Sequence, residues 1–333
     1  MGNGLAHAHS DLSAEDSPPW LPVPPRRSKG LGSRSPRESA VGESSPFGFG
    51  HGKRSLFSRE IGFVKLSPTQ NMTLLIRTEH PEEEYRDIAR QIMAYEHLHA
   101  EQVGFVQKSE SPDADISLRM AGGEFCGNAC MALAALTAAE EGLDPGRPMK
   151  VVLEVSGTKG LVMCHVVKQG NEYVCELAMP TPWAVESVTL TDGVGGRSAL
   201  VRYDNSLHVV IETGRLDQVI REKAQSLAVR LGRTWNVSLV GVMLYDPNSN
   251  CLTPLVHVPA LGSVVWERGC GSGTASLGAY LAWKNNASVV TSVIQPGGTM
   301  KVAADCVQGV LTGIRIEGAV RIVAEGKAYL QVA

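Results

Sequence analysis

Residues 120–136 read MAGGEFCGNACMALAAL, and residues 264–281 read VVWERGCGSGTASLGAYL. Both stretches begin with apolar, strand-like residues, pass through a loop of small residues to a Cys-Gly pair, and continue into a helix rich in alanine and leucine. Cys126 and Cys270 are therefore expected at the N-termini of two helices. Unpaired backbone N–H groups and the positive end of the helix dipole lower the pKa of a thiol at such a position. Two thiols in matched settings predict a pair of acid/base groups that face each other across one substrate carbon.

Such a pair suits the inversion of an α-amino acid at Cα. One cysteine, as thiolate, removes the Cα proton, the other, as thiol, supplies a proton to the opposite face, and the roles exchange in the reverse reaction. The remaining N–H groups of the two helix ends can hold the substrate carboxylate and the developing negative charge. This scheme requires no cofactor, and the glycine clusters of the chain lack the placement of a phosphate or dinucleotide fingerprint.

The composition of the chain excludes several other classes of protein. Its 333 residues suffice for two domains, and a net charge of −3 gives no general attraction to nucleic acid or to an anionic membrane. No apolar run approaches the roughly 20 residues of a membrane-spanning helix, and the N-terminus lacks the apolar stretch of a secretory signal. Seven scattered cysteines favour a reducing cytoplasm. Cys126 and Cys130 lie one helical turn apart, but no second pair completes a metal site.

The order of predicted elements suggests two similar halves behind a tail. The first sixty residues hold 7 of the 18 prolines and 11 serines, so residues 1–58 are expected to be disordered. The order strand, helix, strands, cysteine-capped helix, strands then occurs twice. We therefore expect an N-terminal half, residues 59–183, with Cys126, and a C-terminal half, residues 184–324, with Cys270. A last strand near residues 325–333 is expected to pack back on the N-terminal half, and the site to lie in the cleft between the halves.

Six phrases carry a resemblance to a known family: SPTQNMTLLI, EQVGFV, GGEFCGNA, CGSGTASLG, IQPGG and EGKAYL. From about Glu60 to the C-terminus the chain resembles the diaminopimelate epimerase-like superfamily of cofactor-independent racemases and epimerases. Within it, the chain is most similar to the histidine racemases of staphylopine-type metallophore pathways. The resemblance implies an α+β fold of two pseudo-symmetric domains, each a mixed or antiparallel sheet curled around a central helix. It also implies interconversion of L- and D-histidine for metallophore biosynthesis, without a cofactor.

The resemblance also assigns residues. It makes Cys126 and Cys270 the two acid/base groups, and it implies a substrate-binding set made of Asn71, Glu101, Gly127, Asn128, Gly271, Ser272 and Gly273. Glu101 matches a position that recognises the imidazole ring in these racemases. A carboxylate there makes physical sense, because it can accept the ring N–H or pair with imidazolium.

Three further residues are candidates without an assigned role. His208, in DNSLHVV, resembles the histidine of an Asn-Pro-His phrase in diaminopimelate epimerases, but the preceding pair is Ser206-Leu207 here, so a structural role is an equal alternative. Glu267 and Arg268 are expected to line the cleft. As partners we expect an amino-acid substrate, histidine before others, a second copy of the chain in a homodimer, and, by resemblance alone, a downstream metallophore synthase.

Several alternatives stay open at this point. Diaminopimelate is disfavoured as substrate, because the arginine that follows the first cysteine phrase in its epimerase is missing and the Glu-Arg loop before the second cysteine is shorter. A proline-type epimerase remains a close alternative. Phenazine-biosynthesis-like isomerases generally lack the paired cysteines. A non-catalytic amino-acid or metal-binding protein, in which the thiols merely cap helices, is the remaining class.

Overall fold

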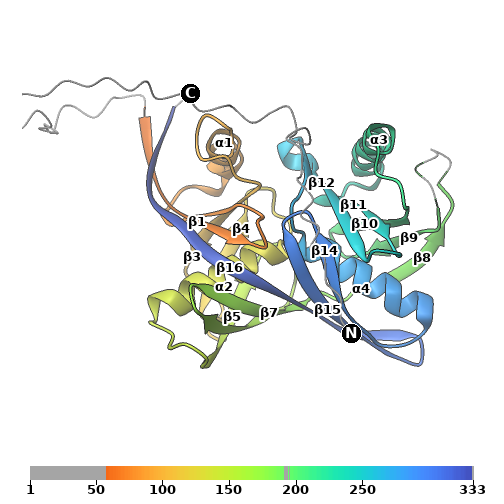
Figure 1. Ribbon diagram of the computed structural model, residues 1–333. Coiled ribbons are helices and arrows are strands. Elements are labelled where there is room, and N and C mark those ends of the chain that lie inside the picture. Colours follow the sequence, from red (N-terminus) through yellow and green to blue (C-terminus); the bar gives the residue numbers. More distant parts are fainter. Residues whose placement is uncertain (1–57, 191–193, 195, 332–333) are drawn as a thin grey trace, which may run out of the picture. The chain divides into compact units, whose positions relative to one another are not determined.

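The computed structural model describes residues 58–190, 194 and 196–331 (Figure 1). The tail predicted for residues 1–58 thus lies outside the described residues, apart from Ser58. The described chain is rich in strands, with four α-helices and sixteen strands joined in one sheet. The mixed α+β class expected from the sequence is confirmed. The division into halves at residue 183 stays a prediction. We call residues 59–183 the N-terminal half and residues 184–324 the C-terminal half.

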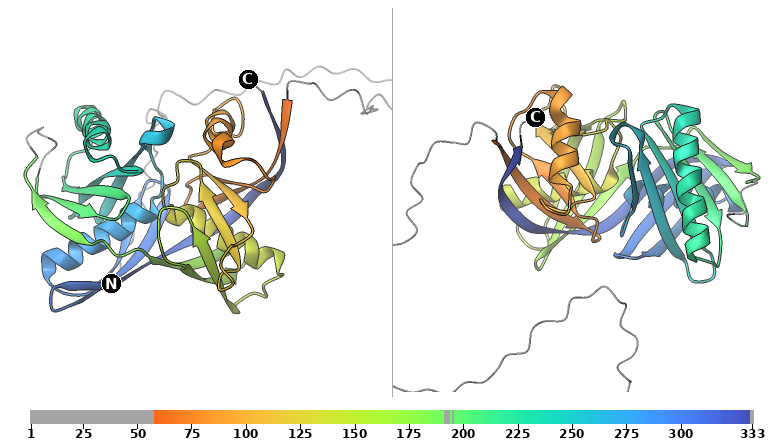
Figure 2. Two further views of the ribbon diagram at one scale, coloured as in Figure 1. Left: turned by 180° about the vertical axis from the view of Figure 1, so that it is seen from behind. Right: turned by 90° about the horizontal axis from the view of Figure 1, so that it is seen from above.

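In the N-terminal half, seven strands and the C-terminal strand β16 surround one helix. The elements are β1 (Ser58–Pro68), β2 (Thr73–Ile76), η1 (Glu82–Glu84), α1 (Tyr85–Ile92), β3 (Gln102–Gln107), β4 (Ile116–Met120), α2 (Gly127–Glu140), β5 (Pro148–Val155), β6 (Val162–Gln169) and β7 (Glu172–Met179). Strands β1 to β7 pair in order, and β16 pairs with both β7 and β1, so the strands close into a ring. Helix α2 packs against most of these strands from inside (Figures 1 and 2).

In the C-terminal half, the strands form an open sheet, and the helix that begins at the second cysteine packs against it. The elements are β8 (Ala184–Val188), β9 (Ser198–Arg202), β10 (Ser206–Glu212), α3 (Gln218–Trp235), β11 (Leu239–Asp246), β12 (Cys251–Val258), η2 (Pro259–Leu261), β13 (Ser263–Trp266), α4 (Gly271–Asn285), β14 (Val289–Gln295), β15 (Gly298–Val307) and β16 (Val310–Gln331). The sheet order runs β16-β15-β14-β12-β11-β10-β9-β8, and α4 packs along it. Helix α3 lies over β11 and β12 (Figure 2).

The same pattern of crossovers occurs twice. Strands β2 and β3 pair in parallel across α1, and β4 and β5 pair in parallel across α2. In the second half, β10 and β11 pair in parallel across α3, and β12 and β14 meet in parallel across α4. A parallel pair needs a long crossover connection, and a helix supplies it in each case. The repeated order of elements read from the sequence is therefore present in the structure.

One long strand joins the two groups of elements. Residues 310–317 of β16 pair with β15, residues 314–320 with β7, and residues 320–331 with β1. The strand begins well before the segment near residue 325 in which the sequence suggests a last strand. Because its backbone hydrogen bonds reach strands of both halves, β16 joins the strands that pack on α2 and the strands that pack on α4 into a single sheet.

Helices α2 and α4 are central because they are apolar or small on all sides. Eleven residues of α2 are buried, and α4 buries ten. A helix that has no polar face is stable only when it is buried in a hydrophobic core. The two helices also contact each other. Gly278 of α4 lets the helix approach β15, since a Cβ there would come within 2.5 Å of the Val302 side chain.

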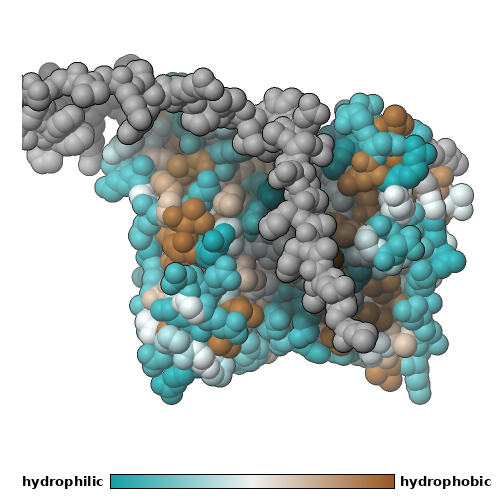
Figure 3. Space-filling view, in the orientation of Figure 1, coloured by the Kyte–Doolittle hydropathy of each residue, from teal (hydrophilic) through white to brown (hydrophobic). Residues whose placement is uncertain are grey.

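Hydrophilic residues cover much of the face seen in the space-filling view, and apolar residues appear in smaller areas between them (Figure 3). Exposed apolar side chains on the strands include those of Val290 and Val310. Among the described residues, no helix has the length and apolarity needed to span a membrane.

Candidate active site

Cys126 and Cys270 occupy the same local geometry. Each is the N-cap residue of its helix, with φ −131° and ψ 107° at Cys126 and φ −128° and ψ 110° at Cys270. The Sγ of Cys126 accepts the backbone N–H of Ala129 at 3.5 Å, and the Sγ of Cys270 accepts that of Gly273 at 3.3 Å. The prediction that both cysteines stand at helix N-termini is confirmed.

The loops that carry the two cysteines are hydrogen-bonded to each other. The carbonyl oxygen of Gly269, next to Cys270, accepts the side-chain amides of Asn128 at 2.8 Å and of Asn71 at 3.0 Å. Asn128 Oδ1 is buried and has no partner among the described residues. Asn71 and Asn128, which the sequence suggests as substrate ligands, thus already meet at the residue before the second cysteine.

Gln295, the last residue of β14 and part of the IQPGG phrase, holds the start of α4. Its Oε1 accepts the backbone N–H of Cys270 at 2.8 Å, and its Nε2 donates to Thr274 Oγ1 at 2.7 Å. Sequence reasoning did not assign this residue a role. The only signal was its place in a family phrase, because the contact joins residues far apart in the chain.

The expectation that the helix ends lower the thiol pKa values is wrong as a net result. Burial raises the pKa of Cys126 far above its ordinary value, and the charge of Glu267 raises it further, while the Ala129 N–H acts in the opposite direction. Burial also raises the pKa of Cys270, and Glu267 adds to the rise. Only 7% of Cys126 and 2% of Cys270 are exposed. The loss of solvation therefore outweighs the helix ends in this closed arrangement.

Two buried carboxyls, Glu124 and Glu267, and the half-buried carboxyl of Glu101 lie near the two cysteine loops. Burial raises the pKa of Glu101 to about 7, of Glu124 to about 7 and of Glu267 to about 8. Glu101 Oε2 accepts the Asn71 amide at 3.1 Å, and Glu267 Oε1 accepts the Gln102 amide. Glu267 lies beside Cys270. After burial, the hydrogen bond with Cys270 has the largest effect on the pKa of Glu267, which it lowers. The charge of Glu267 has the largest effect after burial on the pKa of Cys270, which it raises.

Glu124 was not among the residues singled out from the sequence. It stands two residues before Cys126, in GGEFCGNA, and is 3% exposed. Nothing in the local spacing distinguishes it from a solvated loop carboxylate, which is the usual state of glutamate. Val258, a residue of the other half, lines the same small cavity as Glu124.

The glycines of the two cysteine phrases face protein side chains. A Cβ on Gly127 would lie 3.2 Å from Met179, and one on Gly271 would lie 2.9 Å from Ile316. At Gly273 a Cβ would come within 2.4 Å of Met243 Sδ and 3.2 Å of Cys270 Sγ. Close helix packing therefore explains the glycines at least as directly as the approach of a ligand, which was the expectation from sequence.

His208 and Ser272 line a cavity of about 220 Å³ that residues of both halves enclose. His208 is 1% exposed, and neither ring nitrogen has a hydrogen-bond partner among the described residues. Burial lowers its pKa to about 4, so the ring is neutral. Phe125, the residue before Cys126, lines the same wall. The cavity thus adjoins both cysteine loops, and His208 is part of its wall.

Arg268 directs its side chain outward. Its guanidinium donates to Gln70 Oε1 at 2.8 and 3.1 Å and to the Pro296 carbonyl at 3.2 Å. Its backbone, by contrast, hydrogen-bonds the Glu101 carboxylate and opposes the rise in the pKa of that group. In the described residues no group of three or more His, Cys, Asp or Glu side chains is arranged to hold a metal ion.

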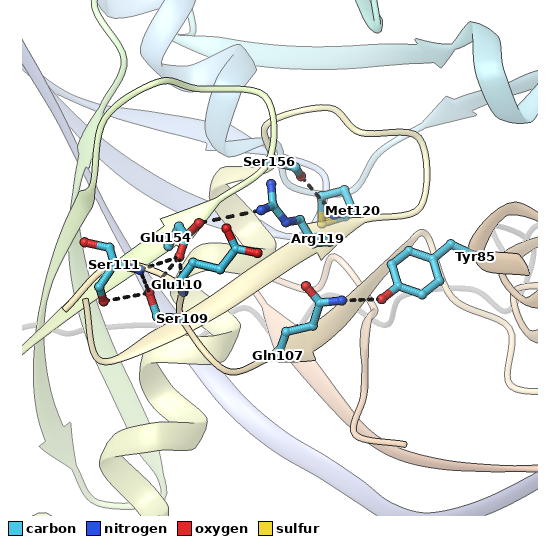
Figure 4. Close-up of polar contacts among 9 residues, drawn as sticks. All are labelled: Tyr85, Gln107, Ser109, Glu110, Ser111, Arg119, Met120, Glu154 and Ser156. Atoms are coloured by element: carbon cyan, nitrogen blue, oxygen red, sulfur yellow. Dashed lines mark hydrogen bonds and ion pairs between the residues drawn. The ribbon is translucent and has the colours of Figure 1, made fainter. Parts of the chain in front are cut away.

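Ser156 and Gly157, in the turn between β5 and β6, support the loop that leads to Cys126. The Ser156 hydroxyl accepts the Met120 N–H at 2.9 Å (Figure 4). It also donates to the Glu124 carbonyl at 2.9 Å. Gly157 has φ +77°, and a Cβ there would come within 2.2 Å of the Phe125 nitrogen. Ser156 therefore bridges the two ends of the loop, and Gly157 leaves room for the loop backbone that a side chain would block.

With this geometry in view, the chain was compared with known proteins. The family model "Histidine racemase CntK N-terminal domain" matches residues 60–329. A histidine racemase of Staphylococcus aureus strain Mu50 is 35% identical over 274 residues, which are 81% of this chain and 98% of that protein. A histidine racemase of Fusobacterium nucleatum subsp. nucleatum is 29% identical over 273 residues, 81% of this chain and 97% of that protein.

Solved structures agree on the fold. A hydroxyproline epimerase from Agrobacterium vitis, with bound trans-4-hydroxy-L-proline, superposes with a TM-score of 0.59 at 13% identity, over 83% of this chain and 93% of that one. At that identity the likeness concerns the fold alone. The family model covers most of the chain, and the resemblance read from the cysteine phrases is confirmed. The chain belongs to the histidine racemase family.

Proposed function

We propose that this protein interconverts L- and D-histidine by a two-base proton transfer at Cα, with Cys126 and Cys270 as the two acid/base groups. The observation that carries the proposal is the matched pair of N-capping cysteines on α2 and α4, whose loops are bonded to each other. Membership of the histidine racemase family supports both the reaction and the substrate.

In the proposed reaction, the thiolate of one cysteine takes the Cα proton and becomes a thiol. The electron pair left on Cα is stabilised by the substrate carboxylate, which the free backbone N–H groups of the helix ends hold. The thiol of the other cysteine gives its proton to the opposite face of Cα and becomes a thiolate. The two cysteines end the turnover with exchanged protonation states, and the reverse reaction uses them in the opposite order.

The site needs one thiolate, although burial disfavours it. Glu267 is the group that can take the proton, because it lies beside Cys270 and its own pKa is about 8, close to neutrality. A thiol and a carboxyl that together lose one proton supply the thiolate without placing two charges in the same buried space. Glu267 therefore acts as the proton acceptor of Cys270 in this proposal.

Glu101 is the proposed ligand of the imidazole ring. Its carboxyl is half-buried and accepts the amide of Asn71, which also donates to the Gly269 carbonyl next to Cys270. A buried carboxylate that accepts an N–H discriminates strongly against side chains that lack one, because its oxygen would otherwise stay unpaired.

Incubation of the purified protein with L-histidine in D₂O, without added pyridoxal phosphate, tests the proposal. D-histidine and deuterium at Cα should both appear, as followed by chiral chromatography and proton NMR. The absence of exchange with histidine, with exchange of diaminopimelate or proline instead, would reassign the substrate. No exchange with any of the three would overturn the racemase reaction itself.

Two expectations about partners rest on the resemblance. We propose that the protein is a homodimer and that a metallophore synthase consumes its D-histidine. Sedimentation velocity decides the first, since a monomer at micromolar concentration contradicts it. The second requires an enzyme that consumes D-histidine and leaves L-histidine unreacted.

A further inference from the structure

A second, smaller cavity of about 10 Å³ lies on the side of the carboxyls. Its wall contains the three carboxyls of Glu101, Glu124 and Glu267, the amide of Gln102 and the hydroxyl of Ser263, and is otherwise apolar. A space of this size accommodates about one water-sized group, such as a single N–H. The three acids approach it from three separate places in the chain: the start of β3, the loop before α2 and the loop before α4.

Glu124 is the one of these three acids that the proposed mechanism does not use. Its Oε2 is fully buried and has no partner in hydrogen-bond geometry among the described residues; the backbone N–H groups of Gly122 and Glu124 only oppose the rise in the pKa of the carboxyl, which burial dominates. A Cβ on Gly122 would lie only 2.5 Å from this oxygen, so the loop backbone at Gly122 packs closely against the carboxyl. A buried oxygen without a partner costs free energy, which a ligand that donates to it would recover.

No cationic side chain lines this cavity in the part of the chain that the structure describes. Met93, the residue after α1, and Leu261 of η2 also line this cavity, and both are apolar. His257 of β12 turns instead toward Gly232 of α3, and its Nδ1 pairs with the Ser263 carbonyl at 2.8 Å. The guanidinium of Arg268 lies outside on Gln70, as described above.

The remaining titratable groups that face Glu124 are acids and thiols. Its charge acts on Cys126, Glu267 acts on both thiols, and Glu101 acts on Glu267. A cluster with three acids and no cation is neutralised either by protons or by a positively charged ligand. Burial, which raises the pKa of Glu124 to about 7, leaves it protonated in part near neutral pH, ready to ionise against such a ligand.

From this geometry we infer that Glu124 is a second specificity-determining carboxyl, which together with Glu101 receives the imidazole ring in its protonated, cationic form. The inference rests on the proposed function and adds to it the charge state of the bound ring. Glu267 stays with the thiols, and the cavity takes the N–H that the ring directs between the other two carboxyls. A neutral ring brings only an N–H, which a single acceptor satisfies, whereas imidazolium also brings a positive charge that both acids stabilise around that N–H.

The test compares the wild type with Glu124→Gln in a pH series of kcat/KM for L-histidine. At pH 6 the ring is largely imidazolium, and the neutral amide should lower kcat/KM at least tenfold. At pH 9 the ring is neutral and an amide oxygen still accepts its N–H, so the loss should be threefold or less. A purely structural role of Glu124 predicts the same loss at both pH values, and that result, or no loss at all, overturns the inference.

Glu154→Gln is the matched control. Glu154 lies in the same half, and its carboxylate accepts the Ser109 hydroxyl at 2.7 Å and the Glu110 N–H at 2.9 Å on the outer face (Figure 4). This substitution should leave the pH profile unchanged. If histidine is not exchanged by the wild type, the proposed function fails; if it is exchanged and the loss in Glu124→Gln does not vary with pH, only this inference fails.

A measurement on the wild type covers the case in which Glu124→Gln does not fold. L-histidine and L-thienylalanine, a neutral ring of similar size, are compared at pH 6.5 as protectants of Cys126 and Cys270 against iodoacetamide. Histidine should protect at concentrations at least tenfold lower. Equal protection by the two amino acids overturns the cationic receptor.

Discussion

The side-chain amide of Asn128 donates a 2.8 Å hydrogen bond to the carbonyl of Gly269, so the phrase of the first cysteine is bonded to the residue before the second. This bond is buried and joins α2 to the loop that starts α4. In the proposed reaction, this bond holds in position two thiols that act on opposite faces of one carbon. Positioning of that kind is where small displacements cost most in rate.

Replacement of Asn128 by alanine should therefore lower kcat/KM for histidine by about 10- to 100-fold. The free energy of unfolding should fall by only about 1 kcal/mol, because the Gly269 carbonyl keeps its bond from Asn71. Thr137→Ala is the control, since it removes a bond to the Leu133 carbonyl at the far end of the same helix. Equal activity losses in the two variants would contradict the positioning role of Asn128.

Cys126→Ser and Cys270→Ser should each reduce racemisation at least 1000-fold, because a serine hydroxyl ionises far less readily than a thiol. Each variant keeps one thiol, so exchange of the Cα proton of one enantiomer can survive in D₂O. Chiral chromatography measures racemisation, and NMR measures exchange of L- and D-histidine separately. Opposite enantiomer preferences in the two variants are expected; racemisation by either variant at the wild-type rate refutes the two-base scheme.

Replacement of Glu267 by glutamine should change the pH profile of kcat/KM. In the wild type, the Glu267–Cys270 unit must lose one proton, so activity should rise with pH up to above about 8. In Glu267→Gln the buried thiol has no neighbouring proton acceptor, and the rise should move to higher pH by at least one unit. At pH 8 the variant should lose at least about fivefold, which steady-state kinetics measures. An unshifted profile means that another group accepts the proton.

Ser156→Ala should loosen the loop that carries Cys126 without touching Cys270. The variant loses the bridge between the Met120 N–H and the Glu124 carbonyl, so Cys126 should react with iodoacetamide about tenfold faster. This loss of a buried hydrogen-bonding group costs about 1–3 kcal/mol. Peptide mass spectrometry reports each cysteine separately, and the rate at Cys270 serves as the internal reference. Parallel acceleration at both sites indicates general unfolding instead.

The stability of the ligand-free protein should fall as the pH rises. Burial raises the pKa of Glu124 from an ordinary 4.5 to about 7, so the folded state binds its proton more tightly than the unfolded state. Such a group contributes stability that is complete below pH 4.5 and is lost as the pH rises through 7. Glu101 and Glu267 act in the same direction, with Glu267 up to about pH 8.

The size of this effect can be isolated with Glu124→Gln, which does not titrate. Between pH 4.5 and 8 its free energy of unfolding should decrease less than that of the wild type, by a difference on the order of 3 kcal/mol. Urea unfolding at several pH values gives the comparison. Parallel pH curves for the two proteins would show that Glu124 has the same pKa folded and unfolded.

The sequence alone determined the local setting of the two thiols. Small residues, Cys-Gly and an alanine-rich run are short-range signals for an N-cap and a buried helix, and both cysteines adopt that geometry with nearly equal dihedral angles. The repeated order of elements and the family phrases were equally readable, because they depend on neighbours along the chain. Histidine racemase membership followed from those phrases.

Only the tertiary structure decided the electrostatics of the site. Desolvation and Glu267 reverse the expected shift in thiol pKa, and the cavity that Glu124 lines is also lined by Val258 from the other half. The bond from Gln102 to Glu267 likewise joins residues that no local pattern connects. Sequence spacing records what lies within a helical turn or a strand pair. Solvation and charge at a buried site depend on everything that packs around it, and the chain sets that only when it is folded.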